Sequence, residues 1–143
     1  MADLLYCGSP PVGPDSTAAL LEGAFSAIWA PPMGIRTTLA AGDRIWLVWR
    51  ELRSDPAMLL GTGHVLPTPA GDLAWTNRSA PGIRQAALDL GYSGPANMSF
   101  LRLGDVRIVR PFQAVDRLRD LPTGLSAPTP RQLEGLANVA AAV

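Results

Sequence analysis

The chain of 143 residues contains no lysine, and it has one histidine and one cysteine. All 12 basic residues are therefore arginines, and 12 acidic residues balance them to a formal net charge of zero. A neutral chain lacks the strong positive field with which many proteins grip a long polyanion through many phosphates. Arginine without lysine, in a chain rich in Ala, Pro and Gly, is typical of a GC-rich coding sequence and is weak evidence for chemistry.

The scarcity of cysteine and histidine excludes several kinds of site. Cys7 has no partner for an intramolecular disulfide, and there is no thiol cluster for zinc. His64 alone excludes a metal site built on several imidazoles, and no carboxylate pair has a spacing that demands acid-base work. We therefore expect no metal and no cofactor, and a reducing environment.

Long apolar runs are also missing. No segment approaches the length of a membrane span, and residues 1–5 lack the basic region of a signal peptide. We expect no contact with a membrane and a cytoplasmic location.

What is present is enough for one folded unit. With 48% apolar and 17% charged residues, the chain is long enough for one domain with a proper core and short for two. We expect a single domain over residues 1–143, of the α+β class. Its architecture would be a curved, mostly antiparallel sheet or open β-barrel of five or six strands, flanked by two or three helices.

Residues 39–66 are expected to form the central hairpin of this sheet. A turn at 41–43 leads into a strand at 44–50, and a loop at 54–56 leads into a second strand at 59–66. This pattern is the main basis of the fold prediction.

Several residues of the hairpin have specific expected roles. Trp46 and Trp49 are three positions apart in a strand, so they point to opposite faces, and we expect only one of them in the inner core. Gly61 and Gly63 indicate close backbone packing or a bulge, since the phosphate-loop lysine that would follow them is absent. His64 in this strand is expected to be partly buried.

The other elements follow from periodicity and end signals. We expect strands at 3–7, at 73–77, which would pair with the strand at 59–66, and at 100–109, either as a strand pair or as one bulged strand. We expect helices at 17–29, at 83–90 and after residue 129.

The last helix has the clearest start signal. Thr129 is the expected N-cap, Pro130 the first helical residue and Gln132 the third, which is the spacing of a capping box. Asp43 and Asp105 each follow a glycine before a strand, so we expect their carboxylates to cap turn amides.

Aromatic residues near predicted element ends are the candidates for a ligand site. Trp29 lies at the expected end of the first helix, and Trp75 lies in the strand at 73–77. Aromatic faces of this kind hold extruded bases, although core packing is the alternative explanation. After Trp75 come Asn77, whose amide can read a base edge, and Arg78, which can meet a phosphate; ordinary turn chemistry is the alternative there.

The order of these motifs resembles that of the PUA-like superfamily, the small barrels that include EVE, YTH and ASCH domains. The resemblance covers residues 26–77: Trp29, the Gly-Asp turn at 42–43, the apolar strand, and the sequence Leu-Leu-Gly-Thr-Gly-His-Val. It implies a pocket at the barrel rim for a nucleobase, frequently a modified one. Ser26 and Trp29 would line that pocket, and Trp75 would supply a second wall.

We therefore expect non-enzymatic recognition of a base in DNA or RNA, or of a related small polar ligand, with a modified base as one candidate. Trp29 and Trp75 would stack on the base, and Ser26 and Asn77 would bond its edge. The flanking phosphates would be contacted by three arginines: Arg78, Arg102 and Arg107.

Two other functions stay open from the sequence. The first is a small hydrolase acting on an amide or nucleoside, with His64 as its base. The second is a protein-interaction module that binds another subunit through its Pro-rich loops and C-terminal helix.

Overall fold

The computed structural model describes residues 2–8, 13–22, 27–30, 40–52, 54–67, 74–76, 99–122 and 124–141; for residues 20, 27–30, 74–76 and 99–101 it describes the backbone alone. The elements in chain order are β1 (Asp3–Gly8), α1 (Pro14–Glu22), β2 (Ala27–Ala30), β3 (Arg44–Trp49), β4 (Met58–Val65), β5 (Ala74–Thr76), β6 (Ser99–Ala114), β7 (Gly124–Ser126) and α3 (Pro130–Ala141). The expected helix at 83–90 lies outside the described residues.

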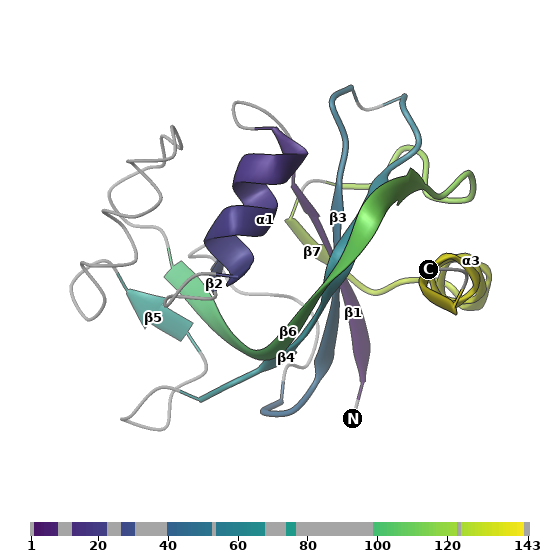
Figure 1. Ribbon diagram of the computed structural model, residues 1–143. Coiled ribbons are helices and arrows are strands. Elements are labelled where there is room, and N and C mark those ends of the chain that lie inside the picture. Colours follow the sequence, from purple (N-terminus) through teal and green to yellow (C-terminus); the bar gives the residue numbers. More distant parts are fainter. Residues whose placement is uncertain are drawn as a thin grey trace.

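The strands form one curved sheet (Figure 1). Its hydrogen-bonded order among the described strands is β2-β6-β4-β3-β1-β7, with β5 also paired to β6, and the order does not close on itself. The pair β1–β3 is parallel, and the other pairs are antiparallel. The expected α+β fold with a curved, mostly antiparallel open sheet is thus confirmed.

Each face of the sheet is packed by a helix. On the α1 face, Leu21 of α1 joins a core with Leu47 and Trp49. On the α3 face, Leu136 of α3 joins a core with Trp46. The expectation that only one of the two tryptophans is in the core is wrong, because both are buried, Trp46 at 4% and Trp49 at 8% exposure.

The N-terminal helix is shorter than the sequence predicts. It ends at Glu22, and Ala27–Ala30 is strand β2, paired with β6. The sequence has a glycine directly after Glu22, the residue type that most often follows a helix end. Isoleucine and tryptophan at 28–29 favour a strand once a partner edge is available.

The strand at Ala74–Thr76 forms as predicted but has a different partner. It pairs with β6 and not with β4. Both edges of β4 are already occupied, one by β3 and the other by β6. Because a strand has only two edges, no place beside β4 was left for β5.

The turn before β3 is held by Asp43 as expected. The buried carboxylate accepts hydrogen bonds from the backbone N–H of Ala2 (2.9 Å) and of Ala40 (2.8 Å), which hold the pKa of Asp43 below its usual value. Gly42 in this turn has φ 89°, a conformation that glycine adopts without a steric penalty.

Strand β6 is one long bulged strand. Thr62 lies opposite Arg107 and His64 opposite Gly104, so two residues of β6, Asp105 and Val106, face the single Gly63. Asp105 has φ 49°, and it makes no turn-capping hydrogen bond within the described residues. The capping role expected for Asp105 is therefore wrong, and the residue sits in the bulge instead.

The expected close packing at Gly61 is confirmed. A Cβ atom on Gly61 would collide with the backbone carbonyl oxygen of Arg107. The capping box of α3 is present as well: Gln132 N–H donates to Thr129 Oγ1 (3.2 Å), and Thr129 N–H donates to Gln132 Oε1 (2.9 Å). Neither helix of the described residues is long and apolar enough to cross a membrane.

Candidate functional site

Two tryptophan positions meet a third aromatic position across β6. Trp29 of β2 lies directly opposite Phe100, and Trp75 of β5 also lies directly opposite Phe100. Because β2 and β5 both pair with the start of β6, they occupy its two edges. Residues directly opposite one another share a face of a sheet, so the three positions form one row across three strands. We call Trp29, Phe100 and Trp75 the aromatic row.

The sequence analysis identified two members of this row and missed the third. Phe100 stands at the start of a predicted strand and has no motif of its own. What links it to Trp29 and Trp75 is register, which the local sequence does not encode. Trp29 was expected at a helix end, and the structure places it in a strand instead.

Alternation along β6 shows which face carries the row. Leu103 is buried on the α1 face, whereas Arg102 is exposed. Successive strand residues point to opposite faces, so the positions of Phe100 and Arg102 belong to the α3 face. Figure 1 shows β2 and β5 at one end of the sheet and α3 at the other.

The bulge brings a second arginine to this face. Arg102 and Arg107 are five positions apart, an odd spacing that would place them on opposite faces of a regular strand. The extra residue of the bulge reverses the alternation, because Arg107 lies opposite Thr62 and thus shares its face. Both arginines are exposed. Arg102 and Arg107 were predicted from the sequence to contact phosphates. The structure places both of them on one face of the sheet.

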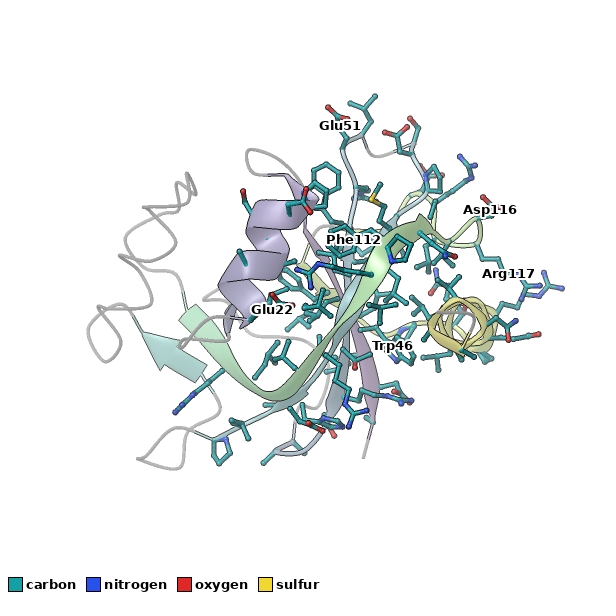
Figure 2. All side chains as sticks on the ribbon, viewed as in Figure 1. Glu22, Trp46, Glu51, Phe112, Asp116 and Arg117 are labelled. Atoms are coloured by element: carbon teal, nitrogen blue, oxygen red, sulfur yellow. The ribbon has the colours of Figure 1, made fainter. Side chains whose placement is uncertain are left out.

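A neighbouring arginine is used differently. Arg110 Nη1 donates a hydrogen bond of 2.7 Å to Glu22 Oε1. Glu22 is the last residue of α1, on the α1 face of the sheet (Figure 2). This bond holds the pKa of Glu22 below its usual value. Arg110 thus ties the helix to the sheet and lies on the side away from the row.

Two further rows of the α3 face connect β3, β4 and β6. In one, Trp46, Thr62 and Arg107 lie opposite one another. In the next, Arg44 lies opposite His64, which lies opposite Gly104. His64 is half-buried.

Arg44 is held in a defined orientation. Its Nε donates to Asp3 Oδ1 (2.6 Å), and Trp46 Nε1 donates to the same oxygen (3.1 Å). The guanidinium carbon lies 4.7 Å from the centre of the Trp46 ring. Partial burial raises the pKa of Asp3, but the hydrogen bonds from Arg44 and Trp46 outweigh it and keep this pKa below the usual value.

A concave surface lies beside the first turn of α3. It has a volume of about 600 Å³ and is lined by Arg117, Thr129, Arg131, Gln132 and Glu134. Thr129 and Gln132 hydrogen-bond each other, and Arg117 Nη1 lies 3.5 Å from Glu134 Oε2 in an ion pair. Four of the five residues that line this surface are thus already paired with one another.

Some predicted site residues lie outside the described residues, namely Ser26, Asn77 and Arg78. Cys7 is buried, and its burial raises the pKa of the thiol. Across the residues that the structure describes, no group of three His, Cys, Asp or Glu side chains is placed to hold a metal ion.

Comparison with known proteins gives matches by structure alone. No family model matches the sequence, and no curated protein matches it at a significant level. Among solved structures, an ASCH protein from Zymomonas mobilis is similar, with a TM-score of 0.57 and 14% identity over 95% of this chain and 94% of that chain.

Two further similar structures are of other proteins. The N-terminal domain of Staphylothermus marinus McrB has a TM-score of 0.56 and 13% identity over 95% of this chain and 93% of that chain. Human THYN1, in complex with 5-methylcytosine containing DNA, has a TM-score of 0.51 and 9% identity over 98% of both chains. At these identities the likeness shows the fold alone, and at the level of the fold the expected resemblance to ASCH domains is confirmed.

Proposed function

We propose that this protein binds nucleic acid and holds one base, a modified base in particular, against the aromatic row. The observation that carries the proposal is register: Trp29 and Trp75 both lie opposite Phe100, on the two edges of β6. Stacking on an aromatic side chain contributes about 1–3 kcal/mol per base. Three aromatic positions in one row provide such a platform from strands that are far apart in sequence.

One of the similar structures supports the same class of ligand. The structure of human THYN1 contains 5-methylcytosine DNA, and that protein shares the fold of this chain. A shared fold does not by itself carry function, so this is support by analogy. The aromatic row is the argument from this chain's own residues.

The polar partners of the base belong to the same proposal. Ser26 and Asn77 would bond the edge of the base, and Arg78 would meet a neighbouring phosphate. Arg102 and Arg107 are exposed on the face that carries the aromatic row. Their position there supports a role in contacting the phosphates that flank the bound base.

The test is a titration of the protein with labelled single- and double-stranded oligonucleotides that carry plain or modified bases. Anisotropy is measured for the wild type, Trp29→Ala and Trp75→Ala. Loss of 1–3 kcal/mol of stacking weakens binding roughly 5- to 150-fold. Trp49→Phe is the matched control, because Trp49 lies in the core on the α1 face, and this variant is expected to bind as tightly as the wild type.

Several results would contradict the proposal. Unfolding of Trp29→Ala, seen by circular dichroism, would assign that tryptophan to the core. Binding that ignores the base and vanishes with salt would leave only contacts between arginine and phosphate. No binding at all would favour the hydrolase, for which His64→Ala abolishes turnover, or the interaction module, for which the mass in solution rises with concentration.

A further inference from the structure

We propose that the ligand is a single-stranded nucleic acid that runs along the α3 face of β6, with Arg102 on the phosphate next to the bound base and Arg107 on the phosphate two nucleotides further along. The inference rests on the proposed function and adds the form of the ligand and its position along the strand. Each arginine contacts a phosphate of its own.

The spacing of the aromatic row and the two arginines is fixed by strand geometry. Phe100 and Arg102 are two residues apart in β6, which is about 7 Å along the strand. The N–H of Leu66 donates to the carbonyl oxygen of Arg102 (2.9 Å), and Thr62 lies opposite Arg107. Leu66 and Thr62 are four residues apart in the chain. The two arginines are therefore about 13 Å apart along the sheet.

These two intervals match the phosphate repeat of an extended single strand. A strand within a duplex rises roughly 3.4 Å per nucleotide, and extension of an unpaired strand about doubles this rise, to about 7 Å. The interval from Phe100 to Arg102 then corresponds to one nucleotide, and the interval from Arg102 to Arg107 to two. The match arises because residues on one face of a strand also repeat at about 7 Å.

Both arginines are available on the surface of this face. Arg102 and Arg107 are exposed, and the side chain of Arg107 makes no hydrogen bond or ion pair among the described residues. A guanidinium offers a planar fork of donors that suits the oxygens of a phosphate.

The stretch of β6 between the two arginines has no cation of its own. Gly104 has no side chain there, and the side chain of Leu66 lies where a Cβ atom of Gly104 would be. Asp105 is exposed in the bulge, and its carboxylate would repel a phosphate. We therefore expect the phosphate between the two contacts to be held by neither arginine.

The bend of β6 favours a single strand over a duplex. In Figure 1, β6 bends with α1 on the inner side, where Arg110 holds Glu22 of that helix. The α3 face is therefore the outer side of the bend. A duplex has a persistence length of about 150 base pairs and turns once in about 10 base pairs, so its backbone leaves the line of a bent strand. An unpaired strand is flexible enough to follow it.

The test is a series of single strands from one to about six nucleotides long. Each strand carries, at its 5′ or its 3′ end, the base that binds most tightly in the titration proposed above, and abasic nucleotides elsewhere. We expect the affinity of the wild type to rise about 10-fold with the second nucleotide and again with the fourth. Arg102→Gln should remove the first rise, and Arg107→Gln the second.

Only the series whose tail points along β6 should show both rises, which also gives the polarity of the bound strand. The strands are made with a DNA and with an RNA backbone, because the two share the phosphates on which the proposal depends.

Arg110→Gln is the matched control. It removes the same charge from an exposed arginine on the α1 face of β6, and both rises should persist. An even increase of wild-type affinity with length, or a rise at the fourth nucleotide that survives Arg107→Gln, would overturn the assignment. Equal losses from Arg107→Gln on a duplex with the same base would overturn the choice of a single strand.

A change in the ligand tests the same contacts without altering the protein. In a strand that spans both arginines, a neutral methylphosphonate at the first or the third linkage should weaken binding about 10-fold. At the second linkage it should leave binding unchanged, and an equal loss there would contradict the proposal. If the wild type binds no strand, the proposed function itself fails. If strands bind through Trp29 and Trp75 without these steps, only this inference fails.

Discussion

At the scale of single residues, the bulge in β6 determines what the α3 face presents. Asp105 adopts φ 49°, a left-handed conformation that Asp tolerates better than most residues. With Val106 it occupies the space opposite one residue of β4. This extra residue is the reason that Arg102 and Arg107 share a face.

Gly61 is the residue at which the sheet tolerates no side chain. In Gly61→Ala the new Cβ would strike the backbone of β6 at Arg107, which cannot rotate away. We expect a loss of about 1–3 kcal/mol in the free energy of unfolding, measured by urea denaturation. Gly8→Ala is the control, because a Cβ there meets its nearest neighbour at 3.7 Å, an ordinary contact.

Gly8→Ala should be neutral or stabilise by about 0.4–1 kcal/mol. Equal stability of both variants and the wild type would show that β4 and β6 separate easily at Gly61. The close packing that orders Thr62 and Arg107 in one row would then be absent.

Residue chemistry predicted several single positions correctly. Asp43 after Gly42 was predicted as a turn cap, and it holds two backbone N–H groups. Gly61 was predicted as a point of close approach. Phe100 was not identified, because its significance depends on two strands that lie far from it in the sequence.

At the scale of elements, predictions succeeded where the signal is local. The capping box at Thr129 and the central hairpin form as predicted. The segment Ala27–Ala30 was mistaken for the end of a helix, because its apolar residues also fit a helical period. An available edge of β6 outweighed that weak helical preference.

Helix α3 offers a test of its predicted start. Thr129→Ala removes the side-chain oxygen that accepts the Gln132 N–H. We expect a loss of about 1 kcal/mol in the free energy of unfolding, measured by chemical denaturation. Asn138→Ala, at an exposed position of the same helix, should change stability by less than about 0.5 kcal/mol.

A loss in Asn138→Ala as large as that in Thr129→Ala would contradict the capping role. The loss in the free energy of unfolding would then follow from any substitution in α3 and not from removal of the cap.

At the scale of the whole molecule, the sheet separates two hydrophobic cores and contributes side chains to both. Leu59 belongs to the core on the α3 face and Leu60 to the core on the α1 face, although they are neighbours in the chain. Both are at most 1% exposed. We expect Leu59→Ala and Leu60→Ala each to lower the free energy of unfolding by about 2–5 kcal/mol.

The measurement is urea unfolding followed by tryptophan fluorescence and by far-UV circular dichroism. Coincident transitions are expected, since both cores rest on the same strands. A tolerated change at either leucine would mean that its face of the sheet is only loosely covered.

Local sequence patterns were enough to predict the class of the fold, the central hairpin, the turn at Asp43 and the start of α3. These features depend on residues close together in the chain, whose periodicity and capping chemistry are local. The strands that flank β6, and the side chains that share a face, follow from long-range strand pairing that no local pattern encodes. Partner choice depends on which strand edges are free, and one bulge residue reverses the alternation that the spacing of Arg102 and Arg107 implies. The aromatic row and the arginine pair arise from those two effects.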